Sequence, residues 1–158
     1  MAGFAEQDTG VVNLQELLKG RSLVGMNSYF ALVANASTAP MEMPGSGTAS
    51  FKLHSHEGII TDTATQARLA STASDASLKI DFGARRFETS MTVSAGAVSI
   101  PIQATGAVEA NGNFASQAFI YPTAIQGIVG GSQASQAVYL YQRSIKGYDA
   151  SGVASWLK

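Results

Sequence analysis

The chain has 158 residues, a length at which one domain with a single hydrophobic core is expected. Only 13% of the residues are charged and the net charge is −1, so the sequence offers no basic field for nucleic acid or an anionic membrane. There is no cysteine, which excludes a disulfide framework and any metal site built from thiolates.

Residues 1–22 differ from the rest and are predicted to form an N-terminal extension. Asn13 suits the N-cap of a helix, Glu16 stands three residues later as in a capping box, and Gly20 suits the helix stop. We therefore expect a short helix over about residues 14–19, with a linker from an upstream domain as the alternative. The first ten residues have neither a basic start nor an apolar run, so no signal peptide is expected there.

From Leu23 onward, apolar and polar residues alternate, as in antiparallel strands with one buried face. The clearest strand begins at Thr48 and has an apolar face of Ala49, Phe51 and Leu53. Its other face is polar and carries Thr48, Ser50, Lys52, His54 and His56. Because side chains alternate along a strand, both histidines are expected on the outer face.

Residues 77–93, SLKIDFGARRFETSMTV, are predicted to form a hairpin of two such strands around a tight turn at Gly83. The polar side chains Lys79, Asp81 and Glu88 are expected to face water. The opposite face is expected to fill a packed core rather than to line a pore or a ligand cavity, and it comprises Leu78, Ile80, Phe82, Phe87, Thr89, Met91 and Val93.

Four further stretches with strand character follow, at residues 97–108, 114–122, 124–131 and 136–145, and Asn111-Gly112 marks a hairpin turn. About eight strands joined mostly by short turns indicate an all-β protein. Closure into a barrel is favoured because it removes the strand edges. We therefore predict an eight-stranded antiparallel up-and-down β-barrel with a filled core over 23–146, a mostly irregular loop over 57–76, and a C-terminal tail over 147–158.

Four motifs in this order resemble one known family: GSGTASF (45–51), LKIDFGARRFETSMTV (78–93), GNF (112–114) and IQGIVGGSQASQAVYLYQ (125–142). Together they resemble the transferrin-binding-protein-like β-barrel of Gram-negative bacteria over residues 28–142. The glycines and small residues of the family's closing hairpin are matched by Gly127, Gly130, Ala134, Ala137 and Tyr139. The sequence departs from the pattern where Gln136-Ala137 replaces paired glycines and Val129 replaces an aromatic residue.

The resemblance implies an eight-stranded barrel with a filled interior, whose loops and outer surface bind the ligand. The family includes surface lipoproteins that bind transferrin, haem proteins or complement factor H. It also includes C-terminal barrels attached to periplasmic FecR-type domains. The resemblance implies no catalysis, and it transfers no binding residue to this sequence.

His54 and His56 are the sharpest local feature, since they are the only histidines of the chain. Alternate positions on one strand place their rings about 7 Å apart, a spacing at which the pair could bind a transition metal or one ring a haem iron. A metal would need a third ligand, for which Glu57 or Asp62 is available. The alternative is that both are polar residues at the exposed end of a strand.

Two other pairs are candidates for ligand binding. Arg85 and Arg86 flank the turn at Gly83 and could hold an anionic group, or else they are solvated turn residues that discourage edge association. Tyr139 and Tyr141 share one face of a strand and could contact a partner, or else they are ordinary residues of the barrel wall.

The sequence contains no nucleophile elbow, paired-carboxylate motif or cofactor fingerprint, so we expect no enzymatic activity and no resident cofactor. The expected function is a binding domain of the bacterial envelope, periplasmic or at the surface, for a protein or a haem-type ligand. The first alternative is a structural or sensory appendage of a larger periplasmic or secreted protein, and a small hydrolase is a more distant one. A membrane-inserted barrel is disfavoured by the expected outward positions of Lys52, Lys79, Asp81, Glu88 and Gln103.

Overall fold

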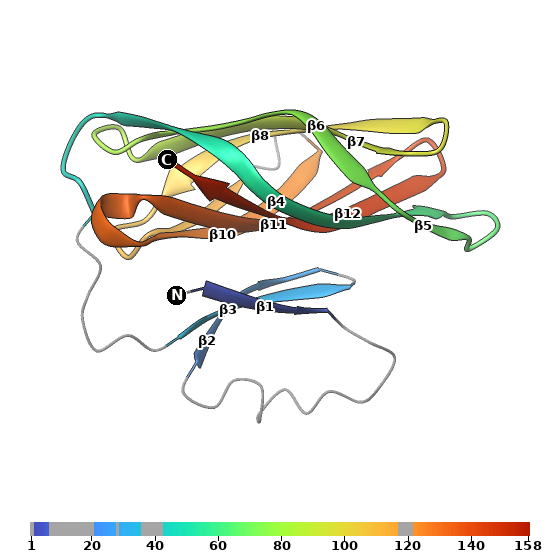
Figure 1. Cartoon of the computed structure of the whole chain (residues 1–158), viewed down its shortest axis with the longest axis horizontal. Helices are drawn as coiled ribbons and strands as arrows, with labels where there is room; N and C mark the ends of the chain where they lie inside the picture. Colours follow the sequence, from blue (N-terminus) through green and yellow to red (C-terminus); the bar gives the residue numbers. More distant parts are fainter. Residues whose placement is uncertain (1, 7–20, 28, 36–42, 117–121) are drawn as a thin grey trace.

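The computed structural model describes residues 2–6, 21–27, 29–35, 43–116 and 122–158, and these form two antiparallel sheets (Figure 1). The smaller sheet has the strand order β1 (Ala2–Glu6), β3 (Phe30–Asn35), β2 (Arg21–Met26). The helix expected at 14–19 lies outside the described residues. Among the described residues, no helix is both long and apolar enough to cross a bilayer.

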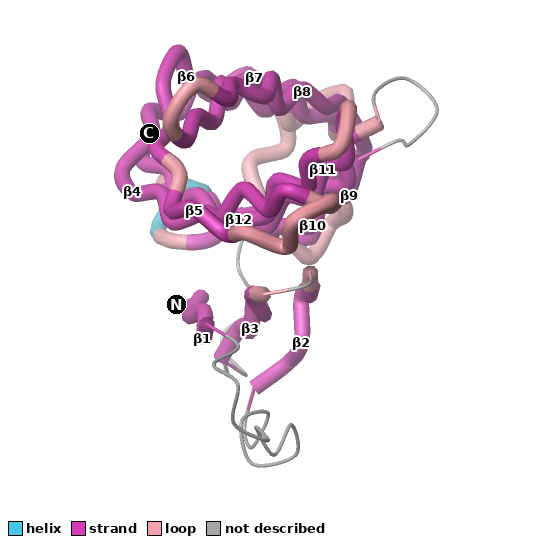
Figure 2. Tube along the Cα trace, turned by 90° about the vertical axis from the view of Figure 1, so that its right-hand side faces the viewer, coloured by secondary structure: helices cyan, strands magenta, loops and turns pink. Residues whose placement is uncertain are grey.

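The larger sheet is an eight-stranded antiparallel barrel, seen end-on in Figure 2. Its strands follow one another around the wall, and β12 pairs with β4 to close the ring. They are β4 (Thr48–Asp62), β6 (Thr72–Asp81), β7 (Arg86–Ala95), β8 (Val98–Val108), β9 (Asn113–Ser116), β10 (Thr123–Gly130), β11 (Gln136–Ile145) and β12 (Tyr148–Leu157). The short strand β5 (Arg68–Ala70) pairs with the end of β4, and a 3-10 turn, η1 (Ser132–Ala134), joins β10 to β11.

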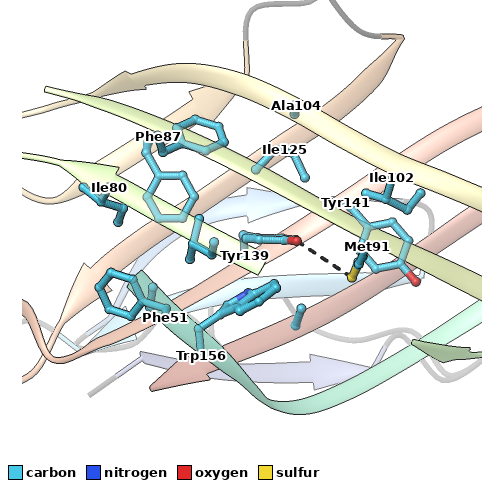
Figure 3. Packing of buried hydrophobic residues seen from close by; sticks show 14 of the residues in the cluster. Phe51, Ile80, Phe87, Met91, Ile102, Ala104, Ile125, Tyr139, Tyr141 and Trp156 are labelled. Carbon is cyan, nitrogen blue, oxygen red and sulfur yellow. Dashed lines mark hydrogen bonds between the residues drawn. The ribbon is translucent and has the colours of Figure 1, made fainter. Parts of the chain in front are cut away.

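The interior of the barrel is filled by side chains, as the alternation of apolar residues predicts. Every second residue of β7 and β8 points inward and is buried, while Lys79, Glu88 and Gln103 on the outside are exposed. Aromatic rings occupy the centre, where Tyr139 packs on Trp156 with ring centroids 5.5 Å apart and Phe87 packs on Phe114 at 4.8 Å (Figure 3). The hairpin at 77–93 therefore encloses a packed core.

Three boundaries predicted from the sequence are wrong. Residues 147–158 are not a tail, because Tyr148–Leu157 is the closing strand β12. The barrel does not begin at residue 23, because β2 and β3 belong to the smaller sheet and the first barrel strand begins at Thr48. The segment 57–76 is mostly extended, since β4 continues to Asp62 and β6 begins at Thr72.

The smaller sheet packs on the outside of the barrel and buries a second apolar cluster there. This cluster joins Phe30 and Leu32 of β3 to Leu140 of β11 and Val153 of β12, all at most 2% exposed. In Figure 1 the three strands lie alongside β10, β11 and β12. The outer face of these barrel strands is therefore covered, whereas the outer face of β6, β7 and β8 remains open.

Candidate functional site

The two histidines do not share a face, because a β-bulge separates them. On β4, Leu53 pairs with Trp156 and Ser55 pairs with the adjacent Ser155, so His54 is one extra residue with no partner on β12. An extra residue reverses the alternation of the side chains that follow it. His54 is thus exposed at the bulge, while His56 points into the barrel, and the predicted common face for the pair is wrong.

His56 meets Tyr141 inside the barrel wall. Its Nε2 atom lies 2.8 Å from the Tyr141 hydroxyl, and the two rings are stacked with 5.8 Å between centroids. Burial lowers the pKa of His56 from its ordinary value of 6.5. Burial also raises the pKa of Tyr141 far above its usual value, so this hydroxyl keeps its proton at neutral pH.

Two glycines make room for the Tyr141 ring. Gly58 of β4 and Gly152 of β12 are directly paired across the wall, and the Tyr141 hydroxyl lies against both of them. A Cβ atom on either glycine would clash with that hydroxyl, and on Gly58 it would also lie 2.6 Å from Ser71 Oγ. His56, Tyr141 and Ser71 therefore converge on the glycine pair as one polar cluster in the wall.

The structure does not bring the predicted third metal ligands to the histidines. Asp62 instead caps a turn, where its carboxylate accepts hydrogen bonds from the backbone N–H groups of Ala64 and Thr65 at 2.9 and 3.1 Å. Glu57 is exposed and pairs with Val153, on the opposite face of β4 from His56. Within the described part of the chain, no three His, Cys, Asp or Glu side chains come together as a set of metal ligands.

Tyr139 and Tyr141 both face the interior, and neither is available to a partner at the surface. They are 0% and 1% exposed. The Tyr139 hydroxyl lies 2.9 Å from Thr89 Oγ1 and donates to Met91 Sδ at 3.8 Å, the contact drawn in Figure 3. Their positions agree with the interpretation of both tyrosines as wall residues.

Arg85 and Arg86 are exposed at the tight turn, as the sequence predicts. The turn is stabilised by Asp81, whose carboxylate accepts a hydrogen bond from the backbone N–H of Ala84 at 2.8 Å. Arg85 has a positive φ of 51° and its carbonyl accepts a hydrogen bond from the N–H of Val108 at 2.9 Å. Both guanidinium groups are therefore held at the end of the barrel where β6 meets β7 and β8 meets β9.

Asn27, which the sequence did not single out, fixes the smaller sheet to the barrel. Its Nδ2 atom donates to the carbonyls of Tyr141 and Gly152 at 3.0 and 3.3 Å. Its Oδ1 atom accepts from the N–H groups of Tyr29 and Phe30 at 3.0 and 2.8 Å. One amide side chain thus satisfies backbone groups on both sides of the interface.

Comparison with known proteins starts from an absence of sequence matches: no protein-family model matches the chain, and no curated protein does. Solved structures do match it. A variant of transferrin binding protein B from Haemophilus parasuis Hp5 aligns with a TM-score of 0.56 at 12% identity. That alignment covers 87% of this chain and 32% of the other. This chain folds as a transferrin-binding-protein-like β-barrel.

Two further structures support that fold. Isotype 1 transferrin binding protein B from serogroup B Neisseria meningitidis aligns over 87% of this chain and 31% of its own, with a TM-score of 0.52 at 14% identity. A protein described as a surface lipoprotein aligns over 94% of this chain and 86% of its own, with a TM-score of 0.52 at 8% identity. The chain thus spans about a third of these transferrin-binding proteins but most of the surface lipoprotein.

Proposed function

We propose that this chain is a non-enzymatic binding domain of the bacterial cell envelope, periplasmic or at the surface, which binds a protein partner through its loops and outer face. The packed interior is the observation that carries the proposal, because aromatic rings occupy the space that a ligand inside the barrel would need. The names of the similar structures, transferrin-binding proteins and a surface lipoprotein, support the same function.

The open end of the barrel near the β6–β7 turn is the proposed contact region. Arg85 and Arg86 are exposed there, and the last residue, Lys158, is exposed with its Nζ atom 6.0 Å from the centre of the Phe82 ring. Three cations at one end favour an acidic surface on the partner, since opposite charges speed and orient association. The open polar wall of β6–β8 adjoins this end.

The second candidate is a structural or sensory appendage of a larger protein. It is favoured by the share of the transferrin-binding proteins that the chain spans, 32% and 31%. In that case the barrel would present or stabilise a neighbouring domain and would bind no ligand itself.

Binding measurements on the immobilised chain separate the two candidates. Iron-loaded transferrin, haem and Zn²⁺ are the probes, and the Arg85→Ser/Arg86→Ser double variant is compared with Lys79→Ser on the open wall. Binding of a protein probe that the double variant weakens, and Lys79→Ser weakens less, supports the proposed binding domain. A stably folded chain that binds none of these probes would favour the appendage.

Replacement of His54 by alanine is expected to leave the fold intact and to weaken any haem binding. His54 is exposed at a bulge and makes no described hydrogen bond, so the free energy of unfolding should change by less than about 0.5 kcal/mol. Thermal melting and a haem titration followed by absorbance check both parts, with Lys52→Ala as the matched exposed control. Haem affinity unchanged by His54→Ala would remove this residue from the site.

A further inference from the structure

The barrel wall is divided between β4 and β6. These strands pair only over Thr48–Phe51 and 78–81, and β4 pairs again only over Ile59–Thr61, this time with β5. The backbone N–H of Ser71 donates to the carbonyl of Gly58 at 2.8 Å, which marks the point where contact resumes. Residues 52–57 and 72–77, all of them described, have no pairing with one another. We call this unpaired stretch the split.

A bulge on each strand causes the split. His54 is the extra residue on β4, and β6 has one extra residue between Ser74 and Ser77 relative to β7. Asp75, which lies in this second bulge, has a positive φ of 49°. Bulges bend a strand and interrupt its ladder, so two opposed bulges force β4 and β6 apart over these residues.

Side chains beside the split are less buried than their equivalents elsewhere in the barrel. Leu78 and Ile80, which point inward where β4 and β6 are paired, are 1% and 0% exposed. At the split, by contrast, the inward-facing side chains are only half-buried, and they are Leu53, His56, Ala73 and Ala76. The core is thus partly open to water through the wall at this place.

The hydrogen bond between His56 and Tyr141 holds the middle of β4 against the barrel interior. In the neutral ring, Nε2 can accept the proton of the Tyr141 hydroxyl at 2.8 Å. Nδ1 is buried and has no hydrogen-bond partner. A protonated ring must donate from both nitrogens, so it would bury a charged donor without an acceptor.

Neighbouring groups do not compensate such a charge. Tyr141 of β11 keeps its proton, and the residue opposite His56 on β12 is Ala154. On β4 itself, His54 and Glu57 are exposed, and so is Asp75 across the split on β6. Arg68 of β5 lies over the Tyr29 ring, 5.0 Å from its centre. Within the described part of the chain, His56 has no ion-pair partner.

We propose that the split is an acid-sensitive latch, in which protonation of His56 breaks its contact with Tyr141 and lets the middle of β4 move away from β6. The imidazolium leaves the interior through the split and reaches water. The pairing at Thr48–Phe51 and at Ile59–Thr61 remains, so the opening is local.

The direction of the pH effect follows from burial. Burial lowers the pKa of His56 in the closed wall below 6.5, while a solvated ring in the open wall has the ordinary value. The open state therefore binds the proton more readily. The latch is fully closed above the ordinary pKa, and its stability is lost as the pH falls through the interval between the two pKa values.

Hydrogen exchange of the full chain tests the latch. Backbone protection of residues 52–58 and 71–77 is measured between about pH 7.5 and about pH 5 and corrected for the intrinsic exchange rate. We expect protection there to fall about tenfold per pH unit between the two pKa values of His56, while the β7–β8 hairpin stays protected. His56→Gln, which can still accept from Tyr141 but does not titrate, should lose this dependence, and His54→Gln should keep it.

Two results would overturn the proposal: pH-independent protection in the unmodified chain, or the same pH dependence in His56→Gln. If His56→Gln does not fold, the unmodified chain still decides, because its two histidines give two imidazole signals that His54→Gln assigns. The titration midpoint of His56 must then coincide with the loss of protection, and a separate midpoint would refute the latch.

Discussion

Replacement of Trp156 by alanine is expected to lower the free energy of unfolding by about 3–5 kcal/mol, the cost of emptying a large buried aromatic site. Trp156 is 0% exposed and lies on β12, where it packs on Tyr139 and pairs with Leu53 of the first barrel strand. Its loss removes core volume and weakens the pairing that closes the ring. Urea unfolding followed by circular dichroism measures the change.

Leu157→Ala is the matched control for this prediction. Leu157 is the next residue of β12 and is 39% exposed, so the same kind of truncation should cost much less. Equal effects of the two substitutions would mean that β12 does not bury Trp156 in the core.

Replacement of Gly152 by alanine is the second large effect, with an expected loss of about 1–3 kcal/mol from overpacking. The new Cβ atom would clash with the Tyr141 hydroxyl and lie 2.6 Å from the carbonyl oxygen of Glu57. The second contact is with backbone of the paired strand, which cannot rotate away as a side chain can. Thermal melting and urea unfolding measure the loss.

Gly130→Ala provides the control within another barrel strand. A Cβ atom on Gly130 would meet nothing within 4 Å, so alanine should be neutral or slightly stabilising there. A neutral Gly152→Ala variant would show that the close contact of β4, β12 and the Tyr141 ring is not as described.

The hairpin at 77–93 could be predicted from the sequence because its alternation is strong. Large apolar residues such as Ile80 and Phe87 alternate with charged ones such as Lys79 and Glu88, and the structure buries the first kind. The exposed turn with Arg85 and Arg86 follows from the same pattern. Where one face is clearly apolar and the other clearly polar, the alternation determines which side chains face inward.

The closing strand could not be predicted in this way. Its inward positions include Ala150, Gly152 and Ala154, because the Tyr141 ring fills the space beside Gly152, and these small residues give a weak hydrophobic pattern. The only strong apolar residue on that face is Trp156. The complementarity between small residues on one strand and a tyrosine on the next appears only once the strands are paired.

The position of His56 was mispredicted because a bulge leaves no mark in the alternation. Lys52, His54 and His56 follow a regular period of two in the sequence, but the extra residue at His54 reverses the face. A signal for the covered outer wall was present, however. The stretch Ala137–Tyr141 of β11 is apolar at every position, which indicates burial on both faces, here by the core and by the smaller sheet.

The fluorescence of Trp156 tests the central claim most directly, namely that β12 closes the wall around a packed interior and leaves binding to the outside. Trp156 is the only tryptophan of the chain, so the signal needs no deconvolution. We predict a blue-shifted emission that acrylamide quenches weakly in the folded chain and strongly after denaturation. Quenching of the folded chain as strong as that of the denatured chain would contradict the claim, because it would place Trp156 on a free tail or in a cavity open to water.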